Sequence, residues 1–395
     1  MNILILNAGS SSIKYQLINM PKEAVICQGI VERIGENDAI IKYKTDKIST
    51  VNTLDIADHN VGLEMVTKLL RDKENGVITN TSDIDIVGHR VVHGGNSYST
   101  TTLITDDVEA KIEALTTLAP LHNPANLQGI ILAKQIFAEA KQIAVFDTAF
   151  HHSLPLVARK YAIPNIFFDN HGIQVYGFHG TSHKYVSEQA NTYLKKQDTR
   201  IITIHLGNGC SITAVNNGKS IDHSLGFTPS NGLIMGTRSG DIDHSIIFYL
   251  VETLGYSLQQ VNEMLLKQSG MLGLTGYSDL RNIQKEAENG NESCQLALEM
   301  SAYRIKKYIG AYTAAMNGLD AIVFTAGIGE NSDTLRKMVC SNMSYLGIEL
   351  DDKKNQIRSN TLAEINLDDS KVKILVIPTN EELEIAKQAY ALITS

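Results

Sequence analysis

The sequence has few cysteines, no block of positive charge and no long apolar stretch, and each shortage excludes a class of protein. The four cysteines among the 395 residues are scattered, with no Cys-x-x-Cys pair, which favours unpaired thiols in a reducing compartment. No run of Lys or Arg stands out and the net charge is −8, so a nucleic-acid surface is not expected. No segment reaches the roughly 18 apolar residues that span a bilayer, and no signal peptide is recognisable at the N-terminus. We therefore expect a cytoplasmic protein that binds neither nucleic acid nor membrane.

The length favours two domains, because 395 residues exceed what one average core holds. Short apolar segments alternate with segments whose apolar residues have helical spacing. This pattern is typical of an α/β fold with mixed strands. An irregular stretch follows residue 148, so we place the boundary near 150. We expect an N-terminal domain over 1–150, completed by a C-terminal helix over 383–395, and a second domain over 151–382.

Each predicted domain opens with a strand, a small-residue turn and a returning strand. The first is an apolar strand that leads into Gly9, three serines and Lys14. Glycine lets a ligand approach the backbone, and the hydroxyls and N–H groups offer donors to an anion. The second runs through residues 200–215, and at an offset of 199 Ile3 matches Ile202 and Ser12 matches Ser211. We interpret this as an internal repeat whose two turns hold a phosphate chain between them.

A third glycine turn follows the apolar strand 321–325 and contains Gly327 and Gly329. The full G-x-G-x-x-G motif is absent, so the dinucleotide signal is weak. Such a turn still lets an adenosine lie against backbone without side chains.

Five polar residues stand at predicted strand ends or tight turns, where α/β proteins place their sites. They are Arg90, Asp147, His179, Arg238 and Glu381. The planar guanidinium of arginine suits a carboxylate or a phosphate. Together they indicate a site for an anionic substrate.

Two other interpretations concern metals. Two histidine pairs have the i, i+4 spacing that could ligate zinc on a helix: His89 with His93, and His179 with His183. Neither first histidine is followed by Glu as in H-E-x-x-H, and nearby glycines argue against a continuous helix. Asp241 and Asp243 could bind a metal or cap a helix.

Nine segments, in this order, resemble the acetate kinase family and span nearly the whole chain: LNAGSSSIKY, GHRVVHGG, LAPLHNPANL, VFDTAFH, YGFHGTSH, HLGNGCSITAV, GTRSGDID, FTAGIGENS and IPTNEE. The resemblance implies two duplicated actin-like (ribonuclease H-like) α/β domains, with mixed sheets flanked by helices and the nucleotide in the interdomain cleft. It also implies reversible Mg²⁺-dependent transfer of the ATP γ-phosphoryl group to acetate, giving acetyl phosphate and ADP. Mn²⁺ could replace Mg²⁺, and the family is typically homodimeric.

The resemblance also assigns roles to residues. Asp147, His179 and Arg238 would be catalytic, Arg90 and His122 would bind the acceptor, and Asn7 and Glu381 would hold magnesium. The nucleotide residues would be Lys14, His205, Leu206, Gly207, Asn208, Gly209, Asp279, Leu280, Arg281, Gly327, Ile328, Gly329, Glu330 and Asn331.

These residue types suit the reaction. Acetate is already an anion and needs no strong base, so the difficulty is to bring it to a polyanionic phosphate. A kinase for propionate or another short carboxylate fits the same motifs, and an actin-like ATP-binding regulatory protein is the alternative of a different class. Cys210 stands where the family often has serine, and oxidation of a thiol beside the phosphate turn could impair the enzyme.

Overall fold

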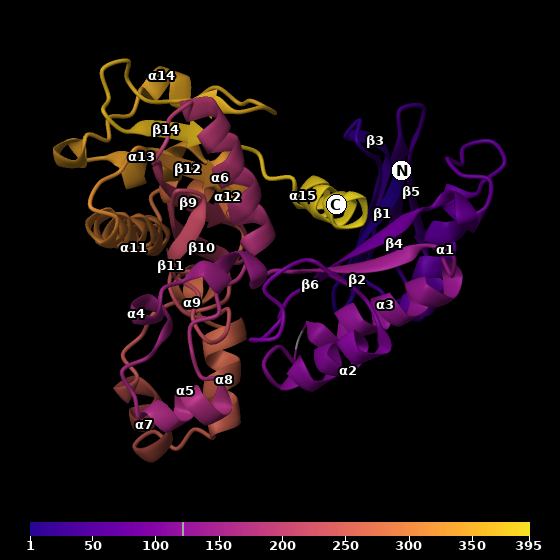
Figure 1. Ribbon diagram of the computed structural model, residues 1–395. Coiled ribbons are helices and arrows are strands. Elements are labelled where there is room, and N and C mark those ends of the chain that lie inside the picture. The colour runs from indigo at the N-terminus through magenta and orange to yellow at the C-terminus, as the bar shows by residue number, and fades with distance from the viewer. Residues whose placement is uncertain (121) are drawn as a thin grey trace. The chain divides into compact units, whose positions relative to one another are not determined.

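The structure is a computed structural model that describes residues 1–120 and 122–395. Two compact units make up the polypeptide: unit 1 is Met1–Ala149 with Asn380–Ser395, and unit 2 is Phe150–Thr379. The expected domain ends at 150 and 382 thus differ by one and three residues from this division, because residues 380–382 lie with unit 1. In Figure 1 the yellow C-terminal helix accompanies the indigo N-terminal strands.

Unit 1 contains an eight-stranded sheet in the order β5-β4-β3-β2-β1-β6-β8-β7. Its elements are β1 (Asn2–Ala8), β2 (Ser12–Asn19), β3 (Ala24–Glu32), β4 (Ala39–Thr45), β5 (Ser49–Leu54), α1 (His59–Leu70), η1 (Thr81–Asp83), β6 (Ile86–Val91), β7 (Thr102–Leu103), α2 (Asp106–Ala114), η2 (Leu115–Thr117), α3 (Asn123–Ile136), β8 (Lys141–Phe146) and α15 (Glu381–Thr394).

Side chains along β1 alternate between the two faces of the sheet, and this alternation explains the layers of unit 1. Leu4 and Leu6 share a core cluster with residues of α1 and α3, whereas Ile3 and Ile5 share one with Ile385 and neighbouring residues of α15. Successive side chains of a strand point to opposite faces. The C-terminal helix therefore covers the face of the sheet opposite α1 and α3.

Unit 2 contains a six-stranded sheet in the order β11-β10-β9-β12-β14-β13. Its strands are β9 (Arg200–Leu206), β10 (Cys210–Asn216), β11 (Lys219–His223), β12 (Ala321–Thr325), β13 (Ala363–Glu364) and β14 (Lys373–Val376). Its helices are η3 (Ala149–Ser153, which begins at the unit boundary), α4 (Leu156–Arg159), α5 (Asn165–His171), α6 (Gly180–Leu194), α7 (Ser245–Glu252), α8 (Leu258–Lys267), α9 (Gly270–Thr275), α10 (Leu280–Glu288), α11 (Glu292–Ala315), α12 (Ala326–Asn331), α13 (Asp333–Cys340), η4 (Ser344–Leu346) and α14 (Asp352–Asn355).

The two sheets share a five-strand core, which confirms the duplicated α/β architecture. In unit 1 the order β3-β2-β1-β6-β8 matches β11-β10-β9-β12-β14 in unit 2. The opening strand of each pairs antiparallel with the returning strand and parallel with the next. The single offset of 199 is wrong in detail, however: Ile3 pairs with Ile18 and Ile202 pairs with Ala214, and these partners lie 196 residues apart. The second hairpin turn is shorter, so Ser12 and Ser211 are not equivalent if Ile3 and Ile202 are.

One local prediction needs correction. The third glycine segment is not an open turn but helix α12, which begins at Ala326 with a left-handed φ of 64°. Helix α2 ends at Ala114, and the chain continues as the short 3-10 helix η2. In the described part of the chain, no helix combines the length and apolar character that a membrane crossing requires.

Candidate active site

Three of the predicted residues of unit 1 lie at the carboxyl ends of its central parallel strands. Asn7 is near the end of β1, Arg90 near the end of β6, and Asp147 directly follows β8. Because β1, β6 and β8 run parallel, their ends meet at one edge of the sheet, where α/β proteins place ligands. Glu381 begins α15 in the same unit.

Arg90 and Asp147 form a bidentate ion pair. The Arg90 Nε donates to both Asp147 carboxylate oxygens at 3.0 and 3.1 Å, and Nη2 donates to Oδ2 at 2.6 Å. The Asp147 side chain is 2 % exposed and that of Arg90 is 19 % exposed. Asp147 thus fixes one edge of the guanidinium, and the donors of the other edge are those that can receive a substrate carboxylate.

A second ion pair joins Lys14 to Glu382, with Nζ 2.5 Å from Oε1. Asn7 is the cross-strand partner of Lys14. Burial raises the pKa of Glu381, and the carboxylates of Asp147 and Glu382 raise it further, while Arg90 and Lys14 lower it. The strand ends therefore carry three carboxylates and two cations, so a metal cation would relieve the excess negative charge.

Helix α3 holds the strand-end loops in place through two buried asparagines. Asn126 Oδ1 accepts from the Val92 N–H and its Nδ2 donates to the Ala8 carbonyl. Asn123 makes the corresponding pair of bonds to the backbone of His93. His122 stands at the N-cap of this helix, directly before Asn123.

In unit 2, His179 and Arg238 both lie against Gly209. A Cβ built at Gly209 would be 3.4 Å from His179 Nε2 and 3.7 Å from Arg238 Nη1. His179 stands at the N-cap of α6 with a left-handed φ of 55°, a conformation that is uncommon for a non-glycine residue and concentrates at functional sites. The turn of the β9–β10 hairpin thus brings two of the predicted catalytic side chains together.

Arg238 differs from Arg90 in its partners. Its Nη1 donates to the Pro229 carbonyl at 2.7 Å and lies 3.7 Å from Met235 Sδ. Within the described residues it makes no ion pair. Burial lowers the pKa of Arg238, although a guanidinium remains charged at neutral pH. It is a half-buried cation for which an anion would be a favourable partner.

A buried network of imidazoles and hydroxyls surrounds His179. Its ring stacks on His205, with centroids 4.4 Å apart, and its Nδ1 lies 2.8 Å from Ser211 Oγ. Ser211 Oγ also lies 2.7 Å from His183 Nε2. Burial lowers the pKa of His183 well below its ordinary value, and His151 and His205 lower it further. His183 is therefore neutral at physiological pH.

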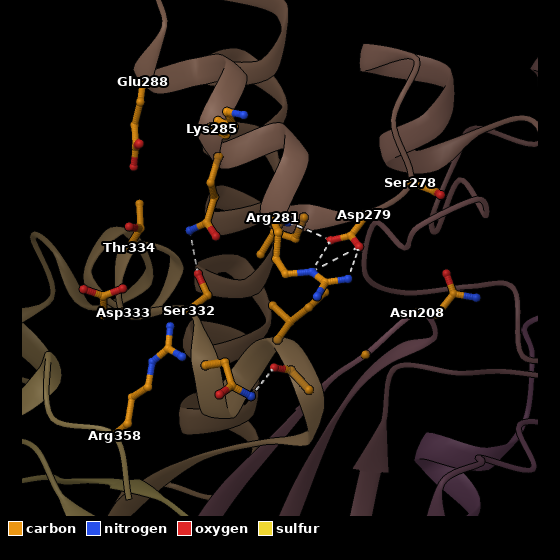
Figure 2. A pocket seen from close by; sticks show the side chains of 16 residues that line it. Asn208, Ser278, Asp279, Arg281, Lys285, Glu288, Ser332, Asp333, Thr334 and Arg358 are labelled. Carbon is orange, nitrogen blue, oxygen red and sulfur yellow. Dashed lines mark hydrogen bonds and ion pairs between the residues drawn. The ribbon is translucent and has the colours of Figure 1, made fainter. Parts of the chain in front are cut away.

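A cavity of about 890 Å³ opens in unit 2 beside the hairpin turn, α10 and α12. Eight of the predicted nucleotide residues line it: Gly207, Asn208, Asp279, Leu280, Arg281, Gly327, Ile328 and Asn331. Figure 2 shows Asn208 and Arg358 at opposite ends of this lining. The predicted residues His205, Leu206, Gly209, Gly329 and Glu330 do not line it; Glu330 Oε1 instead accepts from the Thr379 N–H.

Asp279 and Arg281 are paired at the start of α10 (Figure 2). The Arg281 Nη2 donates to Asp279 Oδ2 at 2.5 Å, and its backbone N–H donates to Oδ1 at 2.9 Å. These bonds lower the pKa of Asp279 to about 2. The pair forms one wall of the cavity.

The zinc interpretation does not agree with the geometry. His89 lies in strand β6 and bonds Gln142, while both ring nitrogens of His183 face hydroxyls, those of Thr203 and Ser211. No group of three or more His, Cys, Asp or Glu in the described residues is arranged to hold a metal. Magnesium that arrives with phosphate oxygens needs only one or two protein ligands.

Two other predictions concerned the aspartates Asp241 and Asp243 and the thiol of Cys210. Asp243 accepts from the Ser245 N–H at the start of α7, and Asp241 accepts from Gly232 N and the Tyr308 hydroxyl. Cys210 is buried, lies 3.3 Å from the Gly207 carbonyl, and burial raises its thiol pKa to about 12. A buried, protonated thiol reacts slowly, which weighs against the expected sensitivity to oxidation.

Several residues of these surroundings could not be found from the sequence. They are Ser182, Thr203, Ser278, Gln284, Lys285, Arg336 and Arg358. Arg336 is 3 % exposed and donates to the Gly329 and Glu330 carbonyls and to Asn355. These bonds hold the C-terminal turn of α12. In the sequence, Arg336 looks like any charged residue of a helix.

The chain is similar to known proteins over nearly its whole length. The chain matches the model of the acetokinase family over residues 2–387. It is 62% identical to the acetate kinase of Flavobacterium johnsoniae over 393 residues, and 47% identical to that of Methanosarcina thermophila over 397, covering 100% of itself and 100% and 97% of those proteins. Among solved structures it is similar to Porphyromonas gingivalis acetate kinase (45% identity) and to a propionate kinase from Francisella tularensis (44% identity). Each has a TM-score of 0.93, with 99% of both chains covered.

Proposed function

We propose that this chain, which belongs to the acetokinase family, catalyses reversible transfer of the γ-phosphoryl group of ATP to acetate, giving acetyl phosphate and ADP. The observation that carries the proposal is Arg90, whose guanidinium is fixed on one edge by Asp147 at the strand ends of unit 1. The full-length similarity to acetate kinases supports the same reaction.

The acceptor is bound by Arg90. Its free edge has paired N–H donors that match the two oxygens of a carboxylate. Acetate needs no base, so Asp147 serves to orient and hold the arginine rather than to remove a proton. His122, at the N-cap of α3, lies on the acceptor side of the transfer.

The donor nucleotide occupies the cavity of unit 2. The backbone of α12 and the Asp279–Arg281 pair receive the adenosine, and the hairpin turn 207–209 receives the phosphates through its N–H groups. The cavity of about 890 Å³ lies in the size range of small-molecule sites. Lys14, paired with Glu382 in unit 1, is an additional cation for the phosphates.

Charge stabilisation drives the reaction. The transferring phosphoryl group spreads negative charge over its oxygens, and Arg238 and His179 are the donors that meet this charge. Bound Mg²⁺, or Mn²⁺ in its place, would neutralise phosphate charge, held by the oxygen ligands of Asn7 and Glu381. Oxygen donors and the excess of carboxylates at this edge fit such an ion.

The decisive experiment measures ADP release with ATP and Mg²⁺ while hydroxylamine traps the acyl phosphate as hydroxamate. We expect ADP and acetohydroxamate in equal amounts and dependent on acetate. A panel of short carboxylates decides between acetate and propionate, since the relatives of known structure include a kinase for each. ADP release without dependence on any carboxylate would contradict the proposal and favour an actin-like ATP-binding regulatory protein.

We also propose that the protein is a cytoplasmic homodimer. Unit 2 exposes apolar side chains on and near α4, α7 and α8, among them Val157 (91 % exposed), Phe248, Tyr249 and Leu258. Exposed apolar side chains favour self-association where they form a patch. Light scattering on the purified protein tests this, and a monomer at micromolar concentration would contradict it.

A further inference from the structure

The imidazole of His179 can carry its proton on either nitrogen, and the two forms do different chemistry. With the proton on Nε2, this nitrogen is a donor to an anionic oxygen; with the proton on Nδ1 alone, Nε2 is an acceptor. Which form is present depends on the groups that face Nδ1. The Ser211 hydroxyl faces this nitrogen and lies between His179 Nδ1 and His183 Nε2 at 2.8 and 2.7 Å.

The chain of bonds continues to a buried threonine. His183 Nδ1 lies 2.7 Å from Thr203 Oγ1, and Thr203, Ser211 and His183 are all fully buried. Among the described residues, His183 is the hydrogen-bond partner found for the Thr203 hydroxyl. The hydroxyl protons of this chain must therefore find acceptors within it.

Two arrangements of the protons are possible. In the first, Thr203 donates to His183 Nδ1, His183 Nε2–H donates to Ser211, and Ser211 donates to His179 Nδ1. Every buried proton then has an acceptor, and neutral His179 carries its proton on Nε2. In the second, each bond is reversed, and the Thr203 hydroxyl proton has no acceptor. Buried donors without partners are strongly disfavoured, so the first arrangement is preferred.

A separate pair of histidines fixes the backbone next to His179. The Phe178 N–H donates to His223 Nε2 at 3.1 Å, and the Phe178 carbonyl accepts from His151 Nε2 at 2.9 Å. Because an N–H only donates and this carbonyl only accepts, the tautomers of neutral His223 and His151 follow. The other nitrogens of these rings face the hydroxyls of Thr213 and Ser220. This explains how the left-handed backbone at His179 is held.

We propose that Ser211, His183 and Thr203 are positioning residues that hold His179 in the tautomer with its proton on Nε2. This inference rests on the proposed function, in which His179 donates to the transferring phosphoryl group. None of the three needs to touch a substrate. They act by determining which nitrogen of His179 is the donor.

The direct test is ¹⁵N NMR of the full-length protein labelled in its histidine side chains, with His179→Asn used to assign the His179 signals. We expect Nε2 protonated and Nδ1 unprotonated in the free protein near pH 7.5. Signals of the opposite tautomer would overturn the inference. This readout does not require activity, so it is separate from a failure of the proposed function.

Thr203→Val supplies the matched perturbation, because valine keeps the shape and removes the hydroxyl. We expect the His179 signals to move toward a mixture of tautomers and kcat to fall about 10-fold, a fraction of the loss typical for removing a stabilising donor, with KM for ATP and acetate within about twofold. Thr203→Ser should restore both. Ser211→Ala should lower kcat by about 10²-fold.

Thr213→Val is the control, since Thr213 is an equally buried threonine bonded to a histidine, His223, in the same hairpin. It should leave the His179 signals unchanged. Wild-type His179 signals in Thr203→Val, or equal effects of Thr203→Val and Thr213→Val on those signals, would contradict the inference even if Ser211→Ala does not fold.

Discussion

The two units share a five-strand order but place different polar chemistry at the ends of those strands. Unit 1 puts its site cations into ion pairs, Arg90 with Asp147 and Lys14 with Glu382. Unit 2 surrounds His179 with imidazoles and hydroxyls, and its Arg238 bonds a carbonyl. A repeated backbone thus supplies equivalent positions, while the residue types at those positions determine what each unit binds.

The difference has a physical reason in the proposed reaction. A small carboxylate and a metal need fixed charges of both signs, and ion pairs fix the orientation of side chains. Charge that develops during phosphoryl transfer needs donors that are in place but not neutralised. Unit 1 therefore resembles a binding site for ions, and unit 2 a preorganised set of donors beside a nucleotide cavity.

Removing each arginine should give the largest effects and tests the difference between the two units. Arg90→Ala and Arg238→Ala should each lower turnover by about 10²-fold or more. Only Arg90→Ala should also lower the free energy of unfolding, by about 3–5 kcal/mol, because it leaves the buried Asp147 carboxylate unpaired. Steady-state kinetics and urea unfolding measure both quantities. Equal stability of the two variants would contradict the contrast between a paired and an unpaired cation.

The buried histidines should make the stability of both units fall at acid pH. Burial lowers the pKa of His89 in unit 1 to about 4, despite its bond to Gln142. Above pH 6.5 the folded and unfolded forms are both neutral; as pH falls from 6.5 to 4, only the unfolded chain gains the proton. His89 should therefore cost about 3 kcal/mol of stability over this range.

His89→Gln tests this, with the exposed His244→Gln as its control. Urea unfolding measures the free energy of unfolding of both proteins. Between pH 7 and 4.5, this free energy should fall by about 2–3 kcal/mol less in His89→Gln than in wild type. The same pH dependence in both variants would show that His89 does not contribute. In unit 2, His183 and His223 act with the same sign, because their pKa values are also lowered.

Much of this architecture could be predicted from the sequence, because apolar strands and glycine-rich turns give local signals. The position of Arg90 and Asp147 at strand ends followed from the chain, but their mutual ion pair did not, since it joins residues 57 apart. Thr203 and Arg336 were missed, and Ser211 was named only as a member of the internal repeat. A buried serine, threonine or arginine has no period or spacing that distinguishes it from a surface residue. The shorter second hairpin was missed because a repeat read at one offset cannot show a difference in turn length.

Glu381→Gln tests the excess of carboxylates in unit 1. The pKa of Glu381 is raised, so the free energy of unfolding falls as pH rises from the unfolded pKa through the folded one. Without metal, the variant should melt about 1–3 °C higher than wild type at pH 7.5. Millimolar Mg²⁺ should raise the Tm of wild type but not of the variant.

The control is Glu139→Gln, an exposed residue of the same unit, which should match wild type in both measurements. A lower Tm of Glu381→Gln in the absence of metal would contradict the excess negative charge.

The smallest effect is expected at Cys210. All four cysteines are buried, so a thiol reagent should label the native protein far more slowly than the urea-unfolded one. Cys210→Ser should keep kcat within about twofold, because the serine hydroxyl can still donate to the Gly207 carbonyl. Fast labelling of native Cys210 with loss of activity would restore the idea of an oxidation-sensitive site.

We propose that unit 2 binds the nucleotide and unit 1 binds the carboxylate. Calorimetric titration with ADP tests this assignment most directly. A Cβ built at Gly327 meets nothing within 4 Å, so Gly327→Leu should fill the cavity and leave the fold intact. Gly310→Leu is the matched control, because Gly310 is also helical and has equally open space. We expect Gly327→Leu to weaken ADP binding by about 10-fold or more, as a side chain that occupies the adenosine position would. Gly310→Leu and Arg90→Ala should bind ADP within about twofold of wild type, and ADP affinity lost in Arg90→Ala but kept in Gly327→Leu would contradict the account.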